Sequence, residues 1–291
     1  MSTEESVLDI SELTSYISSR YGIDLSVYRS SCMKRRIMHR IVMVGCRNVE
    51  DYFFYLDKHP EEIERLKDII TIHVTGFFRD QDVFRKLQTD IFPGLIKRKM
   101  EEGSEVIRIW SAGCSTGEEA YSFAILLDHL LNKKSEKLEL EVFGTDVSED
   151  SIKTAREGRY SEEKITRVPN QMKSAGFEPD GGRFQISSRI RRLVKFRVHD
   201  LFSPTPVSML EIIVCRNVLI HFEHDIRGQI ISSFYSALCD EGMLIRGKSE
   251  SLEIDSDCMF EMIEPISKIL KKRLTAERQP LDPNQIQGGE K

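Results

Sequence analysis

Two glycines and two glutamates, close together, form the part of this sequence with the clearest chemical potential. Gly113 and Gly117 lie in a stretch of small residues between a strand-like run that ends near Trp110 and a helical pattern that begins at Glu118. Glycine lets a ligand approach the backbone closely, and the first turn of a helix offers free N–H groups. Glu118 and Glu119 in that turn would repel a polyphosphate, so the pattern favours a cationic or hydroxyl-rich ligand.

A carboxylate at the end of the next strand-like run supports this interpretation. The run from Leu140 ends in Asp146, and in nucleotide-binding sheets an acid at this place holds ribose hydroxyls. The glycine spacing matches neither the dinucleotide-binding motif nor the phosphate-binding loop with its lysine. Together these features indicate a nucleoside without phosphates. The alternative is that the acids of the helical turn are ordinary capping residues.

Polar residues follow two later strand-like runs in the same way. Asp200 and Leu201 come after an alternating run, and Arg216 and Asn217 end the apolar run Ile212–Cys215. Ligands bind at the carboxyl ends of the strands in an open parallel sheet. We therefore expect these residues to lie at the same site as the glycine turn.

The segment His73–Asp80 joins a helical region to the sheet region. Gly76 and its flanking aromatic residues predict a turn packed against the sheet, with Thr75 and Arg79 pointing into a cleft between two domains. Arginine binds carboxylates through two parallel hydrogen bonds, so Arg79 is suited to hold the carboxylate of a ligand or of a substrate. The alternative is that Arg79 is an ordinary surface residue.

Positive charge is concentrated in one amino-terminal helical pattern. Lys34, Arg35, Arg36 and Arg40 lie within two turns of a chain that is otherwise acidic, while the apolar residues between them would hold the other helix face to a core. One explanation is a solvated basic face. The other is a dock for an acidic partner.

These patterns divide the chain into regions. Residues 1–88 are predicted to form an all-helical domain, residues 89–105 a linker, and residues 106–274 an α/β domain. Within the α/β domain, glycine, proline and alternating residues at about 160–198 predict a small antiparallel β subdomain. The polar residues 275–291 are predicted to be a disordered tail.

The composition limits the class of protein. With 47 acidic and 42 basic residues, the chain is slightly negative, so nucleic acid is not an expected partner. The six cysteines form no CxxC pair and do not cluster with histidine, which argues against a disulfide framework or a metal site. There is no signal peptide and no run apolar and long enough to cross a bilayer. We expect a cytoplasmic monomer without membrane insertion.

Six segments together make the sequence resemble the chemotaxis receptor protein-glutamate O-methyltransferases, the CheR family. The segments occur in the family's order, and they are residues 74–80, 110–122, 143–146, 199–201, 214–222 and 247–250. The resemblance implies an α/β fold with a Rossmann-like S-adenosylmethionine methyltransferase sheet, an N-terminal all-helical domain and a small antiparallel β insertion. It also implies S-adenosyl-L-methionine as the cofactor, S-adenosyl-L-homocysteine as its product, and the cytoplasmic domains of chemotaxis receptors as partners.

The resemblance also assigns roles to individual residues. The implied cofactor-binding residues are His73, Thr75, Arg79, Gly113, Glu119, Asp146, Asp200, Leu201, Arg216 and Asn217. Arg79 and His221 are the implied catalytic residues. The basic helix, through Lys34, Arg35, Arg36 and Arg40, would dock receptor helices that present glutamates. In some relatives the β insertion binds a receptor's C-terminal peptide by strand addition.

The chain departs from the family pattern at four positions. Relatives usually have Asn in place of both His73 and Asp200, and His in place of Lys248. They generally have Tyr in place of His221, near the reacting centre. The charge of an imidazole varies near neutral pH, whereas a phenol stays neutral.

The leading hypothesis is methylation of receptor glutamates with S-adenosylmethionine. A glutamate is ionised at neutral pH, so no strong base is required and positioning carries the catalysis. A second hypothesis keeps the cofactor but has another carboxylate acceptor, either a small acid or a different protein. A third is a scaffold or sensor that binds the cofactor with weak or no turnover.

Overall fold

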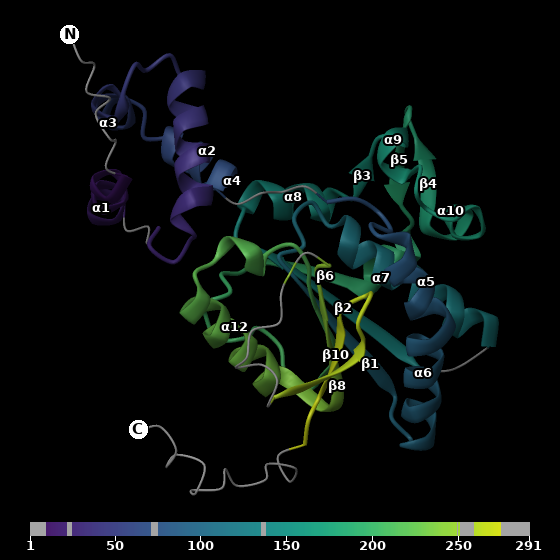
Figure 1. The fold of residues 1–291 in the computed structure, drawn as a ribbon. Coiled ribbons are helices and arrows are strands. Elements are labelled where there is room, and N and C mark those ends of the chain that lie inside the picture. Colours follow the sequence, from purple (N-terminus) through teal and green to yellow (C-terminus); the bar gives the residue numbers. More distant parts are fainter. Residues whose placement is uncertain are drawn as a thin grey trace, which may run out of the picture.

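The computed structural model describes residues 10–21, 25–70, 75–134, 138–248, 250 and 259–274. Amino-terminal helices form one unit beside a large twisted sheet that carries helices on both faces (Figure 1). A second, small sheet lies on the opposite side of the molecule from the amino-terminal helices. The predicted tail, residues 275–291, lies outside the described residues.

The amino-terminal region is helical, as predicted. Its helices are α1 (Ile10–Tyr21), α2 (Ser30–Met43), α3 (Val49–Lys58) and α4 (Glu62–Ile70). They pack around their own core, in which Leu13, Ile17 and Ile37 are fully buried. Helix α3 begins where the side chain of Asn48 accepts a hydrogen bond from the N–H of Asp51 at 2.8 Å, which satisfies one of the free donors of the first turn.

The large sheet has seven strands among the described residues, in the order β6-β2-β1-β7-β8-β10-β9. The strands are β1 (Val106–Ala112), β2 (Glu139–Asp146), β6 (Val194–Val198), β7 (Leu210–Cys215), β8 (Leu238–Arg246), β9 (Phe260–Glu264) and β10 (Ile269–Lys272). The strands from β6 to β8 are parallel, whereas β10 is antiparallel to both of its neighbours. The predicted Rossmann-like α/β sheet is therefore confirmed.

The order of strands reverses at β1, an interior strand between β2 and β7. From β1 the chain builds β2 and β6 on one side, then crosses to build β7 and β8 on the other. Ligands of open α/β sheets bind at such a reversal, beyond the carboxyl ends of the strands. Gly113 directly follows β1 and Arg216 directly follows β7, so the topology brings these two loops together.

Helices cover both faces of this sheet. They are α5 (Gln81–Lys86), the π-helical turn η1 (Leu87–Ile91), α6 (Phe92–Glu101), α7 (Glu118–Lys134), α8 (Glu149–Glu157), α11 (Ser188–Leu193), the short 3-10 turn η2 (Leu219–His221) and α12 (His224–Ala237). Neighbouring residues of β1 serve opposite faces: Ile109 shares a core with Phe123 of α7, and Trp110 packs on Phe234 of α12. No helix in the described ranges combines the length and apolar character needed to cross a bilayer.

The linker predicted for residues 89–105 is instead largely helical. Helix α6 buries Phe92 and Leu95 in the same core as α7. The run Phe-Pro-Gly at its start is typical of a break in a helix, but Pro93 lies in the first turn, where its missing N–H has no helical partner to lose. Helix α6 was therefore not predicted, because Pro93 usually indicates a break but is tolerated in the first turn of a helix.

The small antiparallel insertion is also confirmed. It contains β3 (Arg159–Tyr160), α9 (Glu162–Ile165), α10 (Asn170–Gly176), β4 (Phe177–Asp180) and β5 (Arg183–Ile186), with the strand order β3-β5-β4. Its predicted end near residue 198 is wrong, because β6 joins the large sheet, where Val194 lies opposite Val142 in a parallel pair. The alternating pattern identified β6 as a strand but did not specify its neighbour.

Candidate functional site

The loop after β1 has the tight conformation that its small residues predicted. Gly113 and Gly117 have φ angles of +76° and +93°. A Cβ on Gly113 would lie 2.6 Å from Cγ2 of Val218, so only glycine fits there. The N–H groups of Gly113 and Cys114 both donate to the carbonyl oxygen of Thr145 at 2.8 Å. The loop is thereby held against β2 on one side and against the loop after β7 on the other.

Asp146, the acid predicted to hold ribose hydroxyls, ends β2 beside this loop. Its carboxylate accepts hydrogen bonds from the N–H of Ser115 at 2.8 Å and from the N–H of Ser148 at 3.1 Å. Ser148 in turn caps α8 by accepting from the N–H of Ser151 at 3.2 Å. These backbone donors fix the carboxylate at the wall of a pocket, where 7% of the residue's surface is exposed.

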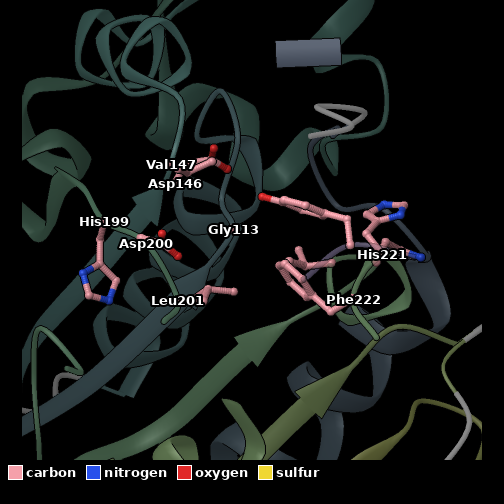
Figure 2. A pocket seen from close by; sticks show the side chains of 11 residues that line it. Gly113, Asp146, Val147, His199, Asp200, Leu201, His221 and Phe222 are labelled. Carbon is pink, nitrogen blue, oxygen red and sulfur yellow. The ribbon is translucent and has the colours of Figure 1, made fainter. Parts of the chain in front are cut away.

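The first pocket lies at the carboxyl ends of β1, β2 and β6 and has an empty volume of about 580 Å³. Six of the predicted site residues line it: Gly113, Asp146, Asp200, Leu201, Asn217 and His221. In Figure 2 the two acids lie on one side of this pocket, and His221 and Phe222 lie on the other. Among the described residues, no lysine or arginine lines the first pocket, which suits a nucleoside without phosphates.

The second pocket, of about 440 Å³, adjoins the first and shares Gly113, Asn217 and Val218 with it. Its lining also contains the predicted residues Thr75, Arg79, Glu119 and Arg216. The structure therefore brings the predicted cofactor-binding residues to two pockets with a common wall. His73 is the exception, since it lies outside the described residues.

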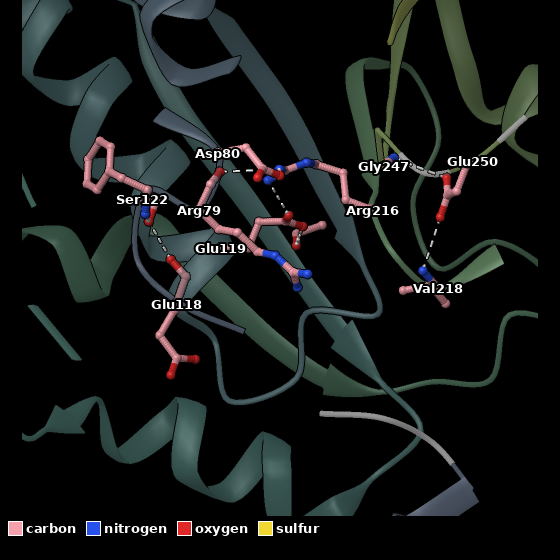
Figure 3. A network of polar contacts seen from close by, with 11 residues as sticks. Arg79, Asp80, Glu118, Glu119, Ser122, Arg216, Val218, Gly247 and Glu250 are labelled. Carbon is pink, nitrogen blue, oxygen red and sulfur yellow. Dashed lines mark hydrogen bonds and ion pairs between the residues drawn. The ribbon is translucent and has the colours of Figure 1, made fainter. Parts of the chain in front are cut away.

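Arg216 is the centre of a buried charge network at the second pocket (Figure 3). Its guanidinium donates to Oε2 of Glu119 at 3.3 Å, to the carbonyl oxygen of Arg79 at 3.2 Å and to the carboxylate of Asp80. Glu119 also accepts from the hydroxyl of Ser111 at 2.9 Å. Burial raises the pKa of Glu119, against the lowering effect of the Arg216 charge.

Glu118, the other acid of the helical turn, has a different role. It is fully buried, and its carboxylate pairs with Lys164 of the insertion and accepts from the hydroxyl of Thr116 at 2.6 Å. It does not line either pocket. Of the two acids of this turn, only Glu119 lines a pocket.

Glu250 fixes the loop after β7. Its carboxylate accepts from the N–H of Val218 at 3.2 Å and from the N–H of Gly247 at 3.1 Å, and burial raises its pKa. Asn217 in this loop has a positive φ of +62°, and a Cβ on Gly247 would lie 2.7 Å from its backbone nitrogen. The loop after β7, which contributes to the common wall of the two pockets, is thus fixed by hydrogen bonds to Glu250 and by close packing against Gly247.

His221 ends η2 at the wall of the first pocket and faces Arg36 of α2. Nη2 of Arg36 lies 3.4 Å from Nδ1 of His221. Burial, with a further contribution from the charge of Arg36, lowers the pKa of His221 to about 4. The imidazole is therefore neutral near pH 7, so the expectation that its charge varies near neutral pH is wrong for this site.

The basic helix α2 divides its cations between two environments. Lys34 and Arg35 are exposed, as a docking surface requires. Arg36 is only 8% exposed, and Nη2 of Arg40 donates to Oε2 of the fully buried Glu62 at 2.5 Å. A buried carboxylate requires a counter-charge, so Arg40 serves the fold. The prediction that all four cations form one docking surface is corrected in this respect.

Five residues of the first pocket were not predicted from the sequence. They are Tyr28, Val147, His199, Val218 and Phe222. Val147, His199, Val218 and Phe222 are sequence neighbours of predicted residues, so their proximity was a usable signal. Tyr28 lies between two helices of the amino-terminal region, and no local pattern indicates that it reaches the sheet.

The residues present fit the cofactor that the resemblance implies. Oδ1 of Asn217 is buried without a hydrogen-bond partner among the described residues. Gly113 adds no side-chain atoms to the common wall, and Asp146 and Asp200 supply acceptors in an otherwise largely apolar pocket. Arg79 lines the second pocket, where a methionyl carboxylate would require a cation.

Comparison with known proteins agrees with this geometry. Residues 8–71 match the CheR methyltransferase all-alpha domain, and residues 73–269 match the CheR methyltransferase SAM binding domain. A chemotaxis protein methyltransferase of Listeria monocytogenes is 30% identical over 82% of this chain and 88% of its own length. A protein of the same name from Borreliella burgdorferi is 29% identical over 87% and 92%, and the chemotaxis protein methyltransferase 2 of Vibrio cholerae is 29% identical over 84% and 85%.

Proposed function

Because the chain belongs to the CheR methyltransferase family, we propose that it transfers the methyl group of S-adenosylmethionine to glutamate side chains of chemotaxis receptors. The products are glutamate methyl esters and S-adenosylhomocysteine. Relatives named as chemotaxis protein methyltransferases support this reaction and its setting. The single observation that carries the proposal is the pair of pockets with a common wall, one apolar with carboxylates and one with arginines.

The two pockets suggest how the chain holds its cofactor. Asp146 would accept hydrogen bonds from the ribose hydroxyls, while Asp200 and Leu201 would contact the adenine from the same pocket. Arg79 would hold the methionyl carboxylate, and Glu119 would face the ammonium group. When bound, S-adenosylmethionine supplies an electrophilic methyl group on a sulfonium.

The chain contributes position and environment to the transfer. The acceptor glutamate is ionised at neutral pH, so it needs no general base. Holding its oxygen at about 3 to 3.5 Å from the methyl carbon, in line with the bond that breaks, supplies much of the rate enhancement. Because the pKa of His221 is lowered, its imidazole is neutral near pH 7 and can orient an acceptor by a hydrogen bond.

The exposed part of α2 is the proposed dock for the receptor. Lys34, Arg35 and His39 are exposed on the helix whose buried residue Arg36 contacts His221. A receptor helix rich in glutamates would complement this surface. Each proposed residue comes from the same chain, so a monomer would suffice, and receptor cytoplasmic domains would place the reaction in the cytoplasm.

The test is incubation of the protein with methyl-labelled S-adenosylmethionine and receptor cytoplasmic fragments. We expect label in the receptor that mild base releases as methanol, because methyl esters hydrolyse under these conditions. Cofactor binding without transfer to any receptor would instead support a scaffold or sensor. Label that appears in another acceptor but not in receptors would overturn the proposed substrate and keep the reaction class.

A further inference from the structure

Tyr28 attaches the amino-terminal region to the wall of the first pocket. It lies in the segment between α1 and α2 and forms an isolated antiparallel bridge with Phe222, and the two rings stack with centroids 5.2 Å apart. The N–H of the next residue, Arg29, donates to the carbonyl oxygen of His221 at 2.8 Å. A backbone pairing of this kind fixes where the Tyr28 side chain emerges.

Two further hydrogen bonds extend this attachment. The N–H of Glu223 donates to the carbonyl oxygen of Val27 at 3.0 Å, and its side chain accepts from the N–H of Ser30 at 3.3 Å. Ser30 is the first residue of α2. The short segment that carries Tyr28 is therefore joined to the pocket wall on one side and to the basic helix on the other.

The phenol of Tyr28 lines the first pocket, which also contains the carboxylates of Asp146 and Asp200. In Figure 2, Phe222 lies across the pocket from both acids. Burial, and then the charges of Asp200 and Asp146, raise the pKa of Tyr28 to about 12, so its hydroxyl carries a proton at physiological pH. In the part of the chain that the structure describes, this hydroxyl has no hydrogen-bond partner.

We propose that Tyr28 is a cofactor-binding residue, which the amino-terminal domain contributes to the nucleoside half of the site by donating a hydrogen bond from its phenol. This inference rests on the proposed function, since it takes the nucleoside of S-adenosylmethionine as the ligand. The two acids can only accept hydrogen bonds, whereas Tyr28 supplies a donor to nucleoside oxygens and ring nitrogens. Tyr28 lies two residues before Ser30, the first residue of α2.

The experiment measures binding by calorimetry, with S-adenosylhomocysteine and with 5′-methylthioadenosine, which lacks the amino-acid half. Tyr28→Phe in the full chain should raise Kd for both compounds by about threefold to tenfold, the effect of one lost hydrogen bond. Arg79→Gln should weaken S-adenosylhomocysteine much more than methylthioadenosine, because Arg79 lines the other pocket. The two variants together locate the phenol at the nucleoside.

Tyr55→Phe is the matched control, since it removes a phenol from the same helical domain at a residue that lines neither pocket. Unchanged binding of both compounds by Tyr28→Phe would overturn the inference, as would an equal loss in Tyr55→Phe. If the wild-type chain bound neither compound, the proposed function would fail as well. Wild-type binding that is unaffected by Tyr28→Phe would remove only the role of Tyr28.

Discussion

In the first pocket the two carboxylates are held one at a time by backbone N–H groups, whereas in the second pocket the charged side chains hold one another. Asp146 accepts from two backbone N–H groups, and Asp200 accepts from the N–H of Phe202 at 3.0 Å. Arg216 and Glu119, by contrast, neutralise each other in a network that is largely buried. Substitutions in the first pocket should therefore change ligand binding at a smaller cost in stability than substitutions in the second pocket.

The largest effect should come from Arg216→Met. Loss of the guanidinium leaves Glu119 and Asp80 without their shared counter-charge, and breaking a buried ion pair from one side costs about 3 to 5 kcal/mol. Urea unfolding with and without the substitution measures this cost. Arg216→Lys keeps the charge and should lose less. A stability change below about 1 kcal/mol for Arg216→Met would mean that the network is not a unit.

Asp146→Asn tests the other side of the comparison. The amide loses the negative charge that favours ribose hydroxyls, so Kd for S-adenosylhomocysteine should rise by about tenfold or more, as expected for a charged hydrogen bond. The unfolding free energy should fall by about 1 to 2 kcal/mol, because the N–H groups of Ser115 and Ser148 contact different carboxylate oxygens and the amide can accept from only one of them. Asp200→Asn is the control and should leave Kd nearly unchanged. Equal losses in both variants would contradict the separate roles.

His221 provides a pH test at the wall of the first pocket. Its folded-state pKa of about 4 lies below the ordinary value of 6.5, so the unfolded chain binds more protons between these values. Stability from this residue is therefore full above pH 6.5 and is lost as the pH falls towards 4. After discounting for partial exposure, the loss should be about 1 to 2 kcal/mol.

Urea unfolding between pH 7 and about pH 5 measures this effect. His221→Phe should flatten the pH dependence of stability, because the substituted chain has no imidazole to protonate. His224→Gln alters an exposed histidine nearby and should leave the slope as in the wild type. A slope unaffected by His221→Phe would show that other groups dominate in this pH range.

The smallest effect should come from the exposed cations of α2, which belong to neither pocket. Lys34→Glu with Arg35→Glu should raise KM for receptor fragments several-fold, which corresponds to about 1 kcal/mol, and the effect should shrink at high salt. Calorimetry should show unchanged cofactor affinity. Arg40→Glu, in contrast, should destabilise the helical domain because Glu62 loses its partner. A fall in cofactor affinity in the double variant would contradict the assignment of a separate dock.

The sequence was sufficient to predict the parts of the site that depend on single strands. Asp146 ends a strand, and Gly113, Asp200 and Arg216 each follow one directly or closely. The carboxyl ends of parallel strands lie at one edge of the sheet, so these residues come together there. It was insufficient where a role depends on distant packing. Nothing near Arg40 in the sequence indicates that it forms an ion pair with the buried Glu62 of another helix. A charged residue is by itself expected to be exposed.

The boundaries of the fold show the same limit. The insertion could be predicted from its glycines and prolines, yet β6 could not be separated from it, because alternation identifies a strand without naming its partner. Tyr28 was missed for a related reason, since its bridge partner Phe222 lies far along the chain. Non-local pairing is set by the folded core, which local patterns do not describe.

Trp110 is the only tryptophan in the sequence, and its position beneath the site has a practical consequence. The indole N–H donates to the hydroxyl of Thr145 at 2.9 Å, and its ring lies 5.9 Å from that of His199, which lines the first pocket. All tryptophan fluorescence of this protein therefore comes from a side chain that contacts a residue of the first pocket. Intrinsic fluorescence offers a label-free optical reporter of occupancy, without a dye or an added chromophore.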